Sequence, residues 1–144
     1  MNNIPQGLIA GFVATVVMSA MLIAKGMMGI MPELDIIATL NRMLMMGDAA
    51  SWVVHFGYGT VLGGLYAYFE PLIPGGSHWI KGTLVGVAAW LVMMVVVMPM
   101  AGAGFFALNI GLMATIMTLV VHIIFGAVLG GTFGALVSRK SATA

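Results

Sequence analysis

The stretch SWVVHFGYGTVLGG, residues 51–64, is written a second time as TLVVHIIFGAVLGG, residues 118–131. Aligned without a gap, 8 of the 14 positions are identical, and the shared positions include the histidines His55 and His122. Two unrelated apolar segments would not agree this well. The pattern indicates an internal duplication, and a duplication decides the architecture of a chain of this size.

The duplication extends beyond these two stretches. GLIAGFVATVVM at 7–18 aligns with GTLVGVAAWLVM at 82–93 and shares both glycines with it. A methionine and a proline follow each of the two segments, ending at Pro32 and Pro99. The repeated unit is therefore predicted to be a span, an interfacial segment and a second span.

The composition predicts that lipid is the solvent. Of the 144 residues, 62% are hydrophobic and 6% are charged, and the mean hydropathy is +1.14, whereas about a quarter of the residues of soluble domains are charged. Long continuous apolar runs favour helices over a membrane barrel, whose strands alternate. The sequence therefore predicts an all-α membrane protein with one transmembrane domain over 1–144.

Two further features of the composition exclude classes of function. The net charge of +1, with no basic cluster beyond Arg139 and Lys140, gives no reason to expect nucleic acid as a partner. The chain has no cysteine, which excludes disulfides and zinc–thiolate sites.

Four transmembrane helices are predicted, at roughly 6–28, 49–72, 79–99 and 114–137. Residues 33–48 repeat apolar positions at helical spacing and are expected to form an amphipathic helix in the membrane interface. The second interfacial segment, 100–113, has no charge and is expected to lie deeper in the interface or against protein. Asp48 or Ser51 is expected to cap the second span. His78, in the short turn between the second and third spans, is expected to be solvated.

The basic residues predict the orientation. Lys81, Arg139 and Lys140 flank one side of the spans, and Lys25 and Arg42 flank the other, where three acids offset them. This small bias favours both termini in the cytoplasm. Because each repeat contains two spans, the halves have the same orientation, and the pseudo-twofold axis relating them is expected to lie along the membrane normal.

The repeated histidines are the strongest candidates for a functional site. Ser51 and Thr118 precede His55 and His122 by four residues, so each hydroxyl lies on the same helix face as its imidazole and is expected to be its partner. The duplication also places both rings at matching depth. They could form interhelical hydrogen bonds, ligate the iron of a b-type haem, or belong to a path for protons or a polar substrate.

Glycines spaced by four residues predict close helix contacts, because a missing side chain lets two backbones approach. These candidate packing positions are Gly7, Gly11, Gly59, Gly63, Gly82, Gly86, Gly126 and Gly130.

The sequence contains no set of residues that points to catalysis, so we expect no enzyme activity. The 15 methionines would suit Cu(I), but adjacent methionines face different ways and methionine is also a common packing residue. No metal site is therefore predicted.

The chain also resembles a family of small bacterial inner-membrane proteins known only as a domain of unknown function. The resemblance rests on the glycine-rich first span, on MPELD at 31–35, on WLVMMVVVMPMAGAGFF at 90–106 and on the His-x3-Gly of the last span. It implies four spans in a bacterial inner membrane and implies no activity.

The function expected from the sequence is that of a non-catalytic accessory subunit. Several glycine faces and short loops favour a protein that packs in the lipid bilayer against other subunits of a respiratory or photosynthetic complex, or against a second copy of itself. Two alternatives are a b-type haem protein with His55 and His122 as axial ligands and a carrier of a small solute, proton or ion.

Overall fold

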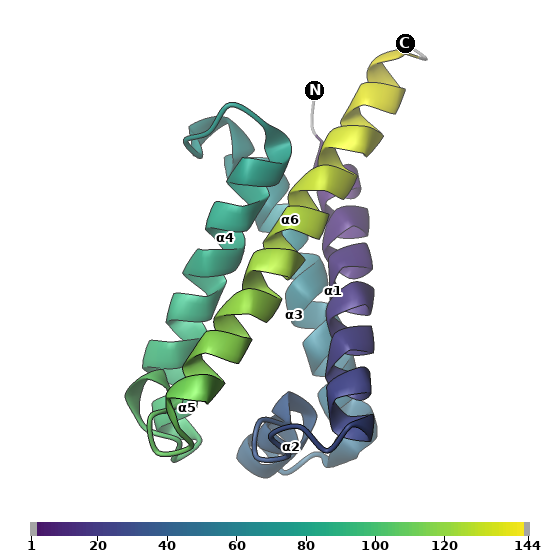
Figure 1. The fold of residues 1–144 in the computed structure, drawn as a ribbon. Helices are drawn as coiled ribbons and strands as arrows, with labels where there is room; N and C mark the ends of the chain where they lie inside the picture. Colours follow the sequence, from purple (N-terminus) through teal and green to yellow (C-terminus); the bar gives the residue numbers. More distant parts are fainter. Residues whose placement is uncertain (1–2, 143–144) are drawn as a thin grey trace.

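The fold is all-helical, as predicted. The computed structural model describes residues 3–142, and within that range it contains five helices and no strand. Four of the helices are long and run side by side, while the short one lies across one end of the molecule (Figure 1). The elements in order are α1 (Ile4–Met27), α2 (Ile36–Leu44), α3 (Gly47–Phe69), α4 (His78–Val92) continued by π-helical Met93–Val97 and α5 (Met98–Met100), and α6 (Leu112–Ala142).

Three of the long helices, α1, His78–Met100 and α6, are long and apolar enough to cross a membrane. The second predicted span, α3, has 23 residues against 24 in α1, but it is not among the three. Its stretch 55–64 contains four glycines, a histidine and a tyrosine, which lower its hydropathy. The last helix begins near the predicted position and continues to Ala142, beyond the predicted end at 137.

The predicted cap of the second span is wrong. Helix α3 begins at Gly47, and its N-cap residue, Met46, makes no side-chain cap; the N–H of Gly47 instead donates to Asn41 Oδ1 at 3.0 Å. The Asp48 carboxylate instead accepts a hydrogen bond from Asn41 Nδ2 at 2.7 Å, and Ser51 Oγ donates to the Gly47 carbonyl at 2.9 Å.

The two predicted interfacial segments adopt different structures. Residues 36–44 form the helix α2 because the Asp35 carboxylate accepts hydrogen bonds from the backbone N–H groups of Ile37 and Ala38, at 2.9 and 3.0 Å. In the 101–111 segment, Gly102 and Gly104 have φ of +80° and +74°, which a continuous helix cannot accommodate. Only a 3-10 turn, η3 (Phe105–Ala107), forms there.

Glycines bring α1 against α3 at backbone contact. A Cβ added to Gly63 would lie 2.6 Å from the Cα of Gly11, and one added to Gly11 would lie 2.9 Å from the Cα of Gly63. Gly7 and Gly59 lie in the same contact, against Gly63 and Thr15 respectively. No other residue type allows this separation.

Helices α4 and α6 pack in the same way. A Cβ added to Gly82 would lie 2.7 Å from the Cα of Gly130, and one added to Gly86 would lie 3.0 Å from the Cα of Gly126. The eight glycines singled out in the sequence therefore lie in these two contacts, four in each helix pair.

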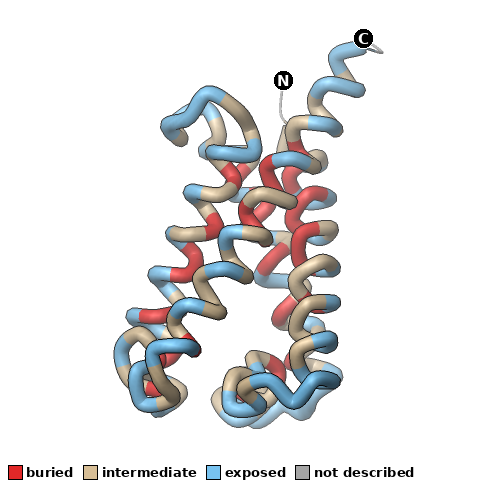
Figure 2. The backbone as a smooth tube through the Cα atoms, viewed as in Figure 1, coloured by how far each residue is buried: buried red, intermediate tan, exposed pale blue. Residues whose placement is uncertain are grey.

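The two helix pairs meet at the end of the molecule that carries both termini and separate toward the other end (Figure 1). Where they meet, α1 packs against α6, and the rings of Tyr66 and Phe133 stand edge to face with centroids 5.1 Å apart. Ala10, Ala14, Phe125 and Leu129 complete this core. Figure 2 shows many of the buried backbone positions gathered along the pairs near this junction, while the separated ends are mostly exposed or half-buried.

Candidate functional site

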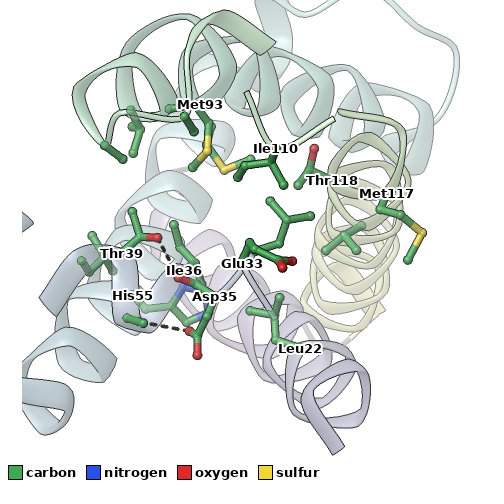
Figure 3. Close-up of a pocket in the computed structure, with 18 of the residues that line it drawn as sticks. Leu22, Glu33, Asp35, Ile36, Thr39, His55, Met93, Ile110, Met117 and Thr118 are labelled. Carbon is green, nitrogen blue, oxygen red and sulfur yellow. Dashed lines mark hydrogen bonds between the residues drawn. The ribbon is translucent and has the colours of Figure 1, made fainter. Parts of the chain in front are cut away.

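A large cavity lies between the two helix pairs, on the side where they separate. Its volume is about 820 Å³. All four long helices contribute to its wall. Residues of α2 and of the 101–111 segment also line it, at the end of the molecule away from the termini, which we call its mouth. Figure 3 shows Leu22, Thr39 and His55 on the side of the first helix pair, and Met93, Ile110 and Thr118 on the side of the second.

Both repeated histidines line this one cavity. His55 comes from α3 in the first half of the chain and His122 from α6 in the second. The fold thus brings together two residues that lie 67 positions apart in the sequence.

The ring of His122 is held with one nitrogen free. Its Nδ1 lies 2.8 Å from the backbone carbonyl of Thr118. A carbonyl can only accept, so Nδ1 carries the proton, and in the neutral ring Nε2 then has a free lone pair. Because this Nε2 makes no hydrogen bond within residues 3–142, it is available to a donor or a metal ion in the cavity.

The ring of His55 is held from the neighbouring helix. Its Nε2 lies 3.2 Å from the hydroxyl of Ser19 on α1, and both residues are buried. Trp52 and Phe56 flank the ring edge to face, with centroids 5.8 Å away in each case. The partner of His55 is therefore Ser19, and the expected partner Ser51 is engaged with the backbone of its own helix.

Thr118 also has a role other than the expected one. Its hydroxyl donates to the carbonyl of Ala114 or Thr115, at 2.8 and 3.0 Å, and accepts a hydrogen bond from Trp90 Nε1 at 3.1 Å. It is the Thr118 backbone that holds His122. The hydroxyl instead ties α6 to α4.

The charged residues that line the cavity lie on α2, on the loop before it, and at the end of α1. Lys25 Nζ donates to the carbonyls of Met31 and Leu34, at 2.8 and 3.0 Å, and so fixes the loop that follows α1. Glu33 reaches over the space between the helix pairs (Figure 3).

The cavity wall on the side of α4 is irregular. Met93 and Val97, which begin and end the π-helical turn, both line it. A π-turn inside a helix realigns the side chains that follow it, and such turns are frequent at functional sites. Here the turn precedes Pro99, whose ring cannot fit an unbroken α-helical ladder.

His78, expected to be solvated, belongs to a polar cluster at the opposite end of the molecule. Its Nδ1 lies 3.1 Å from the Glu70 carboxylate, which also accepts a hydrogen bond from Lys81 Nζ at 2.7 Å. Its backbone carbonyl accepts a hydrogen bond from the Tyr66 hydroxyl at 2.9 Å. This cluster joins α3 to α4 and lies outside the cavity.

Sequence reasoning missed Ser19 and Trp90. The aligned first spans place Thr15 opposite Trp90 and Ser19 opposite Met94, so neither polar contact is repeated in the other half. The contacts of Ser19 with His55 and of Trp90 with Thr118 can be recognised only in the folded chain.

The comparisons with known proteins give a family but no activity. The chain matches no curated protein and no solved structure. One family model matches it, and the match covers residues 1–144. The chain therefore belongs to a family of unknown function, DUF6789.

Proposed function

We propose that this is a four-span membrane protein that holds a ligand in the cavity between its two helix pairs. The observation that carries the proposal is the cavity of about 820 Å³, walled by all four long helices, with both repeated histidines in its lining. Ligand sites in proteins are typically cavities of about 300–1,000 Å³ with mostly apolar walls and a few placed polar groups. Leu22, Val54 and Val121 supply apolar wall, and the imidazoles supply polar contacts.

The membrane arrangement is part of this proposal. Helix α3 packs along α1 through the four glycines and is nearly as long, which supports its crossing the bilayer with the other three. The edge-to-face contact of Tyr66 with Phe133, which occupy equivalent positions in the two repeats, supports a pseudo-twofold axis that passes between them along the membrane normal.

The proposed orientation puts both termini in the cytoplasm of a bacterial cell, with the protein in the inner membrane. Arg139 and Lys140 end α6 on the terminal side, and Lys81 lies near the start of α4 on the same side. The mouth of the cavity then faces away from the cytoplasm.

A matched pair of substitutions tests the proposed binding site. Leu22 lines the cavity, whereas the next residue, Ile23, is 52% exposed on the outside of α1. Leu22→Trp should fill the cavity and remove molecules that co-purify with the wild type, and Ile23→Trp should leave them in place. Native mass spectrometry in mild detergent measures both, and equal occupancy in all three proteins would contradict the proposal.

The haem alternative receives mixed support. His122 offers a free Nε2, the arrangement usual for a metal-ligating histidine whose other nitrogen donates to a carbonyl. His55 Nε2 is engaged by Ser19, so a second axial bond through that nitrogen requires the hydroxyl to move away. A reduced-minus-oxidised absorption spectrum without haem bands would rule out this alternative.

An accessory role within a larger complex is a second proposal. The glycine faces that favoured it in the sequence are used inside the chain. A different surface supports it, a shallow groove on the outer side of α1 and α3 lined by Phe12, Trp52, Phe56 and Gly57. Native electrophoresis after gentle extraction should show a complex, and a lone monomer in every mild detergent would argue against it.

A further inference from the structure

The methionines gather in one half of the molecule. Apart from Met1, the chain has 14 methionines, and every one of them lies at the level of the two histidines or between that level and the mouth of the cavity. The earliest in α1 is Met18, which adjoins the Ser19 that contacts His55. In the half that carries the termini, glycine, alanine, leucine and aromatic residues make the buried contacts instead.

Four of these methionines line the cavity itself. Met18 comes from α1, Met93 from the π-turn after α4, Met98 from α5 and Met117 from α6. Figure 3 shows Met93 on the wall opposite His55. The methionines that line the cavity therefore come from both helix pairs, as the two histidines do.

Packing explains only some of the methionines. Met94 and Met98 are buried in a core cluster with Trp90, where an adaptable side chain fills space. Met27, Met45 and Met100, however, are 85%, 91% and 70% exposed at the mouth end. These exposed methionines lie outside the cavity wall, where they face lipid or solvent.

The side chains that could bind a metal ion in the methionine-rich half of the molecule are soft ligands. Thioether sulfur and neutral imidazole nitrogen are the side-chain ligands that suit Cu(I), and His122 offers a free nitrogen lone pair to the cavity. Residues 3–142 contain no group of three or more histidine, aspartate or glutamate side chains that could hold a metal ion. The chain also has no thiol, the soft ligand that oxidises most readily outside the cytoplasm.

We infer that the cavity binds Cu(I) through methionine sulfurs and the free nitrogen of His122. The inference rests on the proposed binding function and specifies its ligand. Binding involves no change in oxidation state. The neutral imidazole and thioethers coordinate the ion through their lone pairs, so no proton is released.

Competition for Cu(I) against bathocuproine disulfonate tests the inference on the purified full-length protein in detergent. The cavity variant replaces Met18, Met93, Met98 and Met117 by leucine, which is close to methionine in volume and usually costs little stability. The control variant replaces the same number of sulfurs outside the cavity wall, Met27, Met45, Met100 and Met113, all of them exposed. A third protein carries His122→Phe.

The wild type and the control variant should retain Cu(I), while the cavity variant and His122→Phe should bind it about 10- to 100-fold more weakly. X-ray absorption of the copper-loaded wild type should show sulfur and nitrogen neighbours. No retention by the wild type, or equal retention by the cavity and control variants, would overturn the inference. If the protein does not bind Cu(I) but Leu22→Trp still removes a co-purifying molecule, the proposed binding function holds with a different ligand. If the protein neither binds Cu(I) nor loses a co-purifying molecule on Leu22→Trp, the inference and the proposed binding function are both wrong.

Discussion

Gly63 and Gly130 are the residues on which the two helix pairs depend most directly. Each lies so close to the facing backbone that an added methyl group would be within 2.7 Å of a Cα or carbonyl carbon. Gly63→Ala or Gly130→Ala should therefore lower the free energy of unfolding by about 1–3 kcal/mol, as overpacking does elsewhere. Thermal unfolding in detergent measures the change.

Gly131 and Gly57 provide the control for this prediction. Both lie inside long helices, and a Cβ at either position meets nothing within 4 Å. Alanine there should leave stability unchanged or raise it slightly, since alanine favours helix. If all four alanine variants unfolded alike, the backbone contacts would not be the reason for the glycines.

The contact between Ser19 and His55 leads to a prediction that separates the observed partner from the expected one. Ser19→Ala removes the hydroxyl 3.2 Å from His55 Nε2 and should shift the imidazole ¹⁵N resonances of His55. The stability cost should be small, about 0.6 kcal/mol, which is the average for such bonds between membrane helices. Ser51→Ala should leave these resonances unchanged. If Ser51→Ala shifted them and Ser19→Ala did not, Ser51 would be the partner of His55, as expected from the sequence.

At the scale of single elements, α3 is the helix whose place in the membrane needs a test. If all four long helices cross, both termini and the α3–α4 turn lie on one side, and the α2 region lies on the other. The chain has no native cysteine, so Ser138→Cys, Ser77→Cys and Asp48→Cys each give one labelling site. An impermeant thiol reagent added to intact cells should label only the Asp48→Cys protein.

The opposite labelling pattern would show that α3 does not cross the bilayer. If α3 did not cross, only the three most apolar helices would span the bilayer, and the termini would lie on opposite sides. Labelling of Ser138→Cys from outside, together with protection of an N-terminal cysteine, would show that arrangement.

The elements also show how far sequence reasoning reaches. Periodicity and composition predict the all-helical fold, and the glycine pattern singles out the positions at which α1 meets α3 and α4 meets α6. The difference between α2 and the 101–111 segment is local chemistry, an Asp35 cap in one repeat against positive-φ glycines in the other. The duplication alone predicts the same structure for both segments, so the difference between them could not be predicted from it.

At the scale of the whole molecule, the cavity is the feature that no local pattern predicts. The two halves touch through Tyr66 and Phe133 and then separate, and the angle between the pairs results from packing of the whole chain. The sequence predicts that His55 and His122 share a depth. It cannot predict that Ser19 and the Thr118 carbonyl hold the rings and leave a nitrogen of His122 free.

The contact between the two helix pairs distinguishes a binding protein from a carrier. A carrier would need a second conformation in which the cavity opens at the end that carries the termini. That change must separate the Tyr66 and Phe133 rings and the adjoining cluster of Ala10, Ala14 and Leu129. Cysteines that replace Tyr66 and Phe133, joined by a bifunctional thiol reagent, should therefore leave binding unchanged. The same crosslink would abolish uptake into proteoliposomes only if the protein is a carrier.

The most direct test of the central claim is whether a reagent can enter the cavity between the helix pairs. Val121 lines that cavity beside His122, whereas Leu129, two turns further along α6, is fully buried where the pairs meet. The chain has no native cysteine, so each substitution introduces a single thiol. A small water-soluble thiol reagent added from the side of α2 should modify Val121→Cys quickly and Leu129→Cys slowly. A further Leu22→Trp substitution should slow the modification of Val121→Cys. Equal protection of both cysteines, or a Val121→Cys rate indifferent to Leu22→Trp, would contradict the account.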